Sequence, residues 1–199
     1  DLVANAPHVP VHLGSMSHAV KTVLAAVGGA AREGDAWMLN APWNGGTHLP
    51  DVTVITPVFV AGAAAFWLGS RGHHADIGGR TPGSAPPDSR TIEEEGVVID
   101  LFPLVVQGSL REAETRALLA SGRWPCRSPD QNLADLKAQV AANETGRREI
   151  LRAVALHGAN TVSAYMRHVQ RNAEECVRAV IDRLQDGSFR YPMDIGTII

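Results

Sequence analysis

The 199-residue sequence has little of what several protein classes depend on. Its two cysteines, Cys126 and Cys176, lie far apart and form no CxxC pair, so no disulfide framework is expected. A reducing, cytoplasmic setting with two inert thiols is the simpler expectation. The formal net charge of -3 leaves no basic surplus to neutralise a phosphate backbone, which argues against a partner nucleic acid.

Long apolar segments and common catalytic motifs are also missing. The most apolar stretch, residues 52–70, is interrupted by Pro57, Gly62 and Gly69, so no membrane span is expected, and there is no signal peptide. The sequence contains neither a phosphate-binding GxxxxGK[ST] loop nor a GxSxG nucleophile elbow. What remains is an ordinary globular composition, 45% apolar and 20% charged, which can form one sizeable core or two small ones.

The two ends have the character of internal segments. The chain opens on DLVANAP without an initiator methionine, and an Asp before a short apolar strand is typical of the second half of a hairpin. It closes on YPMDIGTII, an apolar strand-like run. We therefore expect a piece, or a processed form, of a longer protein.

The residue pattern changes near residue 108, which predicts an α+β fold with two regions. Residues 1–108 are expected to form a strand-rich region with Gly- and Pro-rich loops, which also holds the candidate site. One helix within it is expected to begin at the N-cap Ser17 and to end at Gly28. The expected strands, of which the first two form a hairpin joined at AGA, are 52–60, 63–70 and 97–106.

Residues 109–199 have helical periodicity and are expected to form three helices. The first would open on SLRE, a capping box of Ser109 and Glu112, and run to Gly122. The second would start near Asp130 and break at the HGAN tetrapeptide.

The third helix has a continuous apolar stripe that ends before Gly187. Such a stripe predicts a face buried in the core, with Cys176 as one of the core residues. Its members are Val162, Tyr165, Met166, Val169, Ala173, Cys176, Val177, Val180, Ile181 and Leu184.

Histidines and aspartates gather in two glycine-rich segments, NGGTHLPD and RGHHADIGG. In a tight loop His48 and Asp51 can point the same way, and with one of the neighbouring His73 and His74 they would supply two imidazoles and one carboxylate. This donor set suits a divalent ion, with zinc, manganese and iron all possible. Because adjacent side chains of an extended segment face opposite sides, only one of His73 and His74 is expected to reach the ion.

Other polar residues near these segments have more than one interpretation. Asp76 could accept a hydrogen bond from a ligand histidine, and Arg71 could hold an anionic substrate or pair with the acidic run at 93–96. His8 and His12 could line the same cleft, although structural roles are the simpler interpretation. Without further information, the histidines could equally be scattered over surface loops.

Three blocks, in this order and spacing, resemble the hydantoinase B/oxoprolinase family, also called the N-methylhydantoinase beta subunit. The blocks are LVANAPHVPVHLGSM, NAPWNGGTHLPDVTVITPVF, and RGHHADIGGRTPGSAPPDS followed by IEEEGVVI. The resemblance covers nearly the whole chain. Because subunits of this family are several hundred residues long, it implies that segments on both sides are absent here.

The resemblance implies a metal site at His48, Asp51 and His73, filled by zinc or manganese. It also implies a partner, the hydantoinase A-type subunit, which binds ATP and phosphorylates the substrate. The B-type subunit would then hydrolyse a cyclic amide such as a hydantoin, 5-oxoproline or a lactam. In the related acetone and acetophenone carboxylases the reaction is instead an ATP-dependent carboxylation of a ketone.

Two further functions remain open at the level of sequence. Two histidines and a carboxylate also serve non-haem iron oxygenases, although those usually show an HxD motif with a distant histidine. Alternatively, the same residues could bind a structural metal ion that holds a loop in place in a non-catalytic scaffold subunit.

Overall fold

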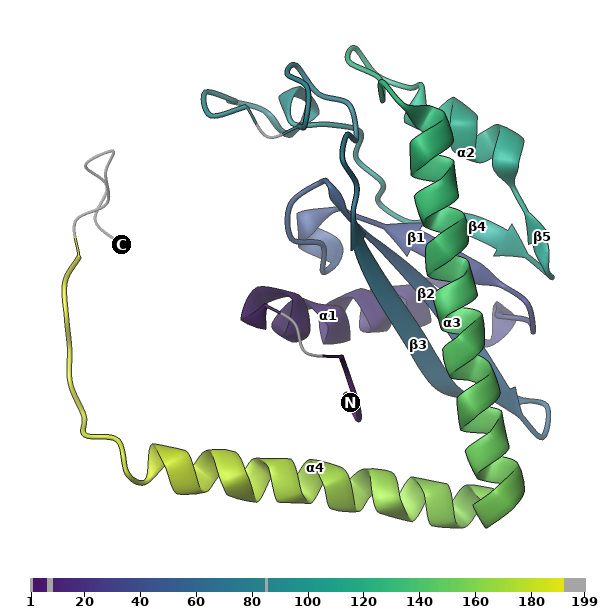
Figure 1. The fold of residues 1–199 in the computed structure, drawn as a ribbon, viewed down its shortest axis with the longest axis vertical. Helices are drawn as coiled ribbons and strands as arrows, with labels where there is room; N and C mark the ends of the chain where they lie inside the picture. The colour runs from purple at the N-terminus through teal and green to yellow at the C-terminus, as the bar shows by residue number, and fades with distance from the viewer. Residues whose placement is uncertain (1, 7–8, 85, 192–199) are drawn as a thin grey trace.

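The computed structural model describes residues 2–6, 9–84 and 86–191, and its centre is a five-stranded sheet (Figure 1). Every neighbouring pair of strands is antiparallel, and the order across the sheet is β3-β2-β1-β4-β5. The strands are β1 (Ala36–Leu39), β2 (Asp51–Val60), β3 (Ala63–His73), β4 (Phe102–Val106) and β5 (Ser109–Leu110). The helices are α1 (Pro10–Val27), α2 (Glu112–Leu119), α3 (Pro129–His157) and α4 (Ala159–Ile181), with short 3-10 turns at Gly28–Ala30, Pro42–Asn44 and Ile92–Glu94.

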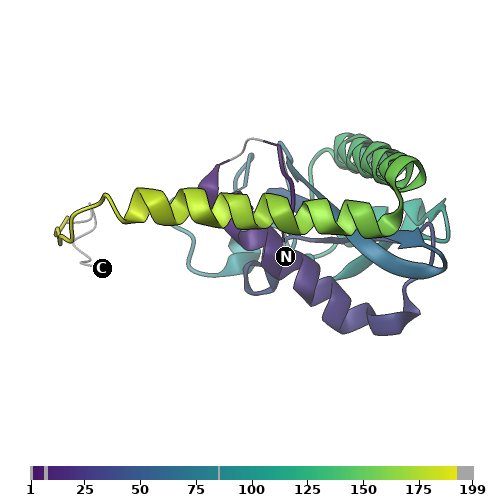
Figure 2. The same cartoon turned by 90° about the horizontal axis from the view of Figure 1, so that it is seen from below.

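Helices cover both faces of the sheet, with α1 on one side and α3 on the other (Figure 2). Alternation along β1 divides its side chains between two cores, because successive residues of a strand face opposite sides. Trp37 and Leu39 pack with Val23 of α1, whereas Met38 belongs to the cluster that includes Leu136 of α3. The predicted α+β class is confirmed.

The β2–β3 hairpin forms as the sequence predicts. Its turn contains Ala61 and Gly62, both with positive φ (51° and 83°), which gives the tight geometry favoured between antiparallel strands. Ten residues of β2 pair with residues of β3 from Asp51 opposite His73 to Val60 opposite Ala63. This long register fixes which side chains share a face.

The remaining strands differ from the prediction. Strand β1 lies at the centre of the sheet, but its four buried residues are too short a run to stand out as a strand in the sequence. The expected strand at 97–106 is shortened to β4, although Val97 and Ile99 before it are buried. Pro103 is accepted in β4 opposite Trp37, beside an irregularity in the register.

The helix starts also need correction. Helix α1 ends at Gly28 as predicted but begins at Pro10, whose fixed φ suits the first helical position, so Ser17 is not an N-cap. The SLRE capping box does not form. Ser109 belongs to β5, and Arg111 is the residue that precedes α2.

Helices α3 and α4 are confirmed as helices, separated by Gly158 with φ of 80°. The predicted burial of the α4 stripe is wrong for the described residues. Tyr165 is 68% exposed and Val169 51% exposed, and Cys176 is exposed rather than part of a core. Figure 1 shows that α4 turns sharply away from α3 instead of running alongside it. Helix α3 therefore does not cover the apolar stripe of α4.

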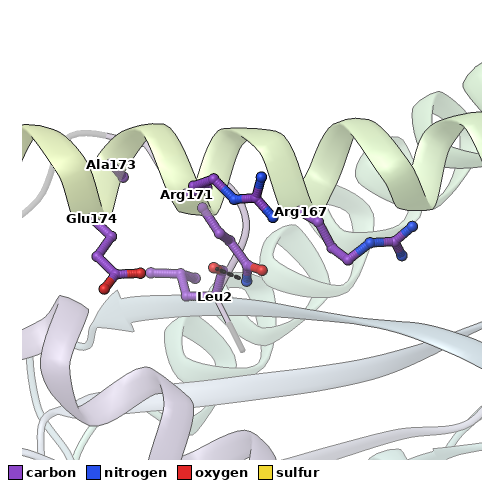
Figure 3. A pocket seen from close by; sticks show the side chains of 6 residues that line it. Leu2, Arg167, Arg171, Ala173 and Glu174 are labelled. Carbon is purple, nitrogen blue, oxygen red and sulfur yellow. Dashed lines mark hydrogen bonds between the residues drawn. The ribbon is translucent and has the colours of Figure 1, made fainter.

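Of the two strand-like segments expected at the ends of the chain, only the first lies in residues that the structure describes. Residues 2–6 form no strand, so the expectation of a strand there is wrong, and the strand-like run at 192–199 lies outside the described residues. Leu2 instead lies against α4, where Gln170 donates a hydrogen bond of 2.9 Å to its carbonyl oxygen at an open hollow (Figure 3).

The division into regions at residue 108 stays a prediction. Within the described chain, α3 packs on β2 and β3, so the helical region and the strand-rich region are in contact. Among the described residues, no helix has both the length and the apolarity that crossing a bilayer requires.

Candidate metal centre

Asp51 is the centre of a cluster at the open end of the β2–β3 hairpin. Asp51 is the cross-strand partner of His73, and cross-strand partners point to the same face of a sheet. His73 Nδ1 lies 3.0 Å from Asp51 Oδ1, and His48 Nδ1 from the preceding loop lies 2.8 Å from Oδ2. The hairpin and the loop therefore bring together three residues, of which Asp51 and His73 lie 22 positions apart in the sequence.

The shape of the loop depends on a close approach of main chain at Gly46. A Cβ atom at this position would lie 1.9 Å from the carbonyl oxygen of Asn40, so only glycine fits. Asn40 is fully buried, and its side-chain amide donates hydrogen bonds of 2.9 Å to the carbonyl oxygens of Leu49 and Val97. The loop that carries His48 is thereby anchored to the core.

The three groups have the chemistry of a divalent-metal site. One donor atom from each of His48, Asp51 and His73 lies within 4.8 Å of the other two. The two imidazole rings stack with their centroids 5.0 Å apart. Asp51 is 3% exposed, whereas the side chains of His48 and His73 are 46% and 60% exposed, so the cluster has a buried carboxylate and an open side. Two imidazoles and one carboxylate that leave further positions free are the donor set of a catalytic metal site.

The surroundings of Asp51 keep its carboxylate ionised. Burial raises its pKa, but hydrogen bonds from Thr47 and His73, and the nearby His48 and His12, outweigh burial and lower the pKa below its usual value. The Thr47 hydroxyl donates to Oδ2 at 2.7 Å. Thr47 was not singled out from the sequence, although its place beside His48 in the same loop was a possible signal.

His12 also belongs to this cluster, which the sequence alone did not establish. It lies in the first turns of α1, and its Nε2 is 3.4 Å from Asp51 Oδ2. The sequence favoured a structural role for it because nothing in the residue pattern showed that α1 would cross this end of the hairpin. His8 lies outside the described residues.

Arg71 lies beneath the cluster and does not reach the acidic run at 93–96. Its guanidinium donates to Thr53 Oγ1 at 2.8 Å and to the carbonyl oxygen of Gly45 at 2.7 Å, and it also contacts Ser15 Oγ at 2.5 Å. Burial lowers the pKa of Arg71, and the charge of Asp51 opposes this effect. Arg71 therefore connects the helix, the loop and the strand that surround the site.

His74 lies on the other face of the sheet from His73. It is 1% exposed, and its Nε2 is 3.3 Å from Gln139 Oε1 while its Nδ1 is 3.0 Å from Asn132 Nδ2, both on α3. The amide nitrogen of Asn132 can only donate, so Nδ1 accepts and Nε2 carries the proton. Burial lowers the pKa of His74. This arrangement agrees with the alternation expected for adjacent residues.

The structure gives Asp76 different partners from the predicted ligand histidine. Its carboxylate accepts hydrogen bonds from the backbone N–H groups of Gly78, Gly83 and Arg127, and from the Arg127 guanidinium at 2.8 Å. Both oxygens are thus engaged in holding the loop after β3. The interpretation of Asp76 as the group that orients a ligand histidine stays a prediction, which these contacts do not support.

Known proteins resemble this chain along nearly its whole length. The family model described as "Hydantoinase B/oxoprolinase" matches residues 1–198. The chain is 48% identical to 5-oxoprolinase 1 of Arabidopsis thaliana over 188 residues, which is 90% of this chain and 15% of that protein. It is 31% identical to the caprolactamase subunit beta of Pseudomonas jessenii over 189 residues, 95% of this chain and 32% of that subunit.

Solved structures extend the comparison to the fold. The ATP-dependent caprolactamase from Pseudomonas jessenii aligns with a TM-score of 0.81 at 31% identity, over 94% of this chain and 32% of that one. Acetone carboxylase, without nucleotide, aligns with a TM-score of 0.62 at 22% identity, over 78% and 20%, which shows the fold alone. The chain thus spans between about a seventh and a third of the relatives named here. With a family model matched from its first residue to its penultimate one, the chain belongs to the hydantoinase B/oxoprolinase family.

Proposed function

We propose that this chain is the metal-binding part of an ATP-dependent amidohydrolase that opens a cyclic amide. The observation that carries the proposal is the convergence of His48, Asp51 and His73 on one point in a member of this family. Two of its relatives are named for the hydrolysis of lactams, 5-oxoproline in one and caprolactam in the other. These names support a shared class of substrate, the lactams, rather than one particular substrate.

In this proposal some residues of the site would bind the metal and others would hold those ligands in position. Asp51, buried and ionised, and the two more exposed imidazoles would hold a zinc or manganese ion, which when bound polarises an oxygen or activates water. The exposed sides of His48 and His73 leave room for a substrate to approach. Thr47 and Arg71 keep the loop and the strand in position around Asp51. The residues of this chain would thus provide metal ligands that carry one negative charge and are held in position.

The amide must be activated elsewhere, because an amide nitrogen is a poor leaving group. The sequence contains no phosphate-binding loop, so ATP would be used by a hydantoinase A-type partner subunit that phosphorylates the substrate. The name of the caprolactamase subunit beta is in keeping with such a division between subunits. Activity would therefore require both subunits.

Other functions have less support. The likeness to acetone carboxylase is at 22% identity and extends to the fold only, so ketone carboxylation is the second choice. An oxygenase reaction would need oxygen, and anaerobic turnover with ATP would exclude it. In a scaffold role the metal would have no exchangeable water, and substitution of its ligands would impair folding before activity.

The test combines metal analysis with an assay of both subunits. The longer subunit that contains these residues is purified alone and with its A-type partner, and ATP hydrolysis and ring opening of 5-oxoproline, hydantoin and caprolactam are measured. Ring opening only with partner, ATP and metal is expected, and His48→Ala should abolish it. Ring opening by this subunit with metal alone would refute the proposal and indicate a self-sufficient metallohydrolase.

A further inference from the structure

A third imidazole reaches the buried carboxylate from helix α1. His12 Nε2 lies 3.4 Å from Asp51 Oδ2, the same oxygen that Thr47 Oγ1 contacts at 2.7 Å. The His12 side chain is only 16% exposed, less than that of either His48 or His73. We propose that His12 is a positioning residue, which fixes the orientation of the Asp51 carboxylate without binding the metal itself. The inference rests on the proposed metal site.

The neighbours of His12 indicate which of its nitrogens carries the proton. Arg71 Nη1 lies 3.5 Å from His12 Nδ1, and a guanidinium can only donate. A neutral imidazole has one N–H, so an accepting Nδ1 places the hydrogen on Nε2, which faces Asp51. A nitrogen that carries a hydrogen has no lone pair for a metal. His12 would therefore act on the carboxylate, whereas His48 and His73 would bind the ion.

The main chain around His12 is fixed independently of any ion. Arg71 Nη1 contacts Ser15 Oγ at 2.5 Å and lies 3.5 Å from the carbonyl oxygen of His12, and its Nη2 donates to Gly45 O at 2.7 Å. The His12 N–H donates to the carbonyl oxygen of Val9 at 3.0 Å. The start of α1 is thus tied to the loop before β2, which gives His12 a constant position relative to Asp51.

The chemical consequence is a carboxylate with restricted rotation. An N–H of His12 directed at Oδ2, beside the Thr47 hydroxyl that donates to the same oxygen, would limit how the carboxylate can turn. Groups that orient a metal ligand in this way change metal affinity by about 10-fold to 100-fold when removed. The effect on affinity therefore measures the positioning role directly, without an activity assay.

Cobalt(II) binding by a set of variants tests the inference. His12→Leu removes the donor and keeps an apolar volume, whereas His12→Gln places an amide N–H near the position of Nε2. His18→Leu, in the same helix and exposed, is the matched control. Affinity is measured by competition with a chelator, the visible spectrum reports the coordination of the ion, and thermal melting verifies that each variant is folded.

The expected result is a loss of about 10-fold in affinity for His12→Leu, with most of it recovered in His12→Gln and an unchanged band shape in the spectrum. Wild-type affinity in His12→Leu would overturn the inference. Equal large losses in both variants, with a spectrum of altered coordination number, would overturn it as well, because His12 would then be a ligand. A wild type and a His48→Ala variant that bind cobalt equally would instead reject the metal site itself.

Discussion

Asp51 and His73 face each other as the first pair of the β2–β3 hairpin, with 3.0 Å between Asp51 Oδ1 and His73 Nδ1. The next residue, His74, points through the sheet to α3. The two adjacent histidines therefore have separable roles, one at the candidate metal centre and one in the core.

Substitution of each histidine by alanine should separate these roles. His73→Ala should lose most of its metal, because one of three protein ligands is gone, and should keep nearly the thermal stability of the metal-free wild type. His74→Ala should keep its metal but lose about 1–3 kcal/mol of unfolding free energy, because Asn132 and Gln139 are left with unmet buried hydrogen bonds. Elemental analysis and denaturant titration measure the two effects, and the opposite pattern would mean that His74 is the ligand.

Gly46→Ala should disrupt the loop that carries His48. The added methyl would lie 1.9 Å from the carbonyl oxygen of Asn40, a backbone atom that cannot move aside cheaply. We expect a loss of about 1–3 kcal/mol or more in stability, together with weaker metal binding. Gly14→Ala is the matched control, because nothing lies within 4 Å of its Cβ position and alanine favours a helix. Equal melting temperatures for the two variants would contradict the close approach.

Glu144 should stabilise the protein in a defined range of pH. A hydrogen bond from Arg147 lowers its pKa to about 2; burial opposes this, and Arg148 supports it. Because the folded pKa lies below the unfolded one, the contribution is complete above about pH 4.5 and is lost as the pH falls toward about 2.

The carboxylate is 36% exposed, so solvent screening reduces its contribution to about 0.5 kcal/mol, or roughly 1–2 °C in melting temperature. Glu144→Gln should melt lower than wild type at neutral pH, and the difference should shrink as the solution is acidified. A difference that grows on acidification would show that another group is responsible.

The two thiols should differ strongly in reactivity. Burial, with the charge of Asp76 adding to it, raises the pKa of Cys126 to about 12, whereas Cys176 is exposed on α4. A thiol reagent in mildly alkaline buffer should therefore label one cysteine rapidly in the native protein and both after denaturation. Cys176→Ser should remove the rapid phase. Slow labelling of Cys176 in the wild type would show that something covers this face of α4.

The sequence predicts those elements whose pattern is complete within one segment. The β2–β3 hairpin has a β-branched run, a turn with glycine and a second run with neighbouring Phe66, Trp67 and Leu68, and α3 has both a helical period and a glycine that ends it, so both were found. Strand β1 was missed because its four residues are all buried and so show no alternation of apolar and polar side chains. Its place in the sheet depends on partners far along the chain. The Ser109 capping box failed because the same residues also complete the small β4–β5 pair.

For the site, local spacing indicated His48 and Asp51 together with one of His73 and His74, because the loop and the hairpin lie close in sequence. The choice of His73 came from the family resemblance. The position of His12 could not be obtained in this way, since it depends on how α1 crosses the sheet. The burial of the α4 stripe was predicted from periodicity, which identifies an apolar face but not what covers it. Contacts between distant segments therefore account for most of the differences.

The long hairpin also determines where the chain tolerates a change in length. Inserting one residue within β2 or β3 would shift the register, and every later side chain would move to the opposite face, which would part Asp51 from His73. At the Ala61–Gly62 turn, the far end of the same hairpin, extra residues would leave all the pairs intact, and a Cβ at Gly62 would meet nothing within 4 Å. An affinity tag or a fluorescent label belongs at that turn, where it can report on the protein without reaching the candidate metal centre.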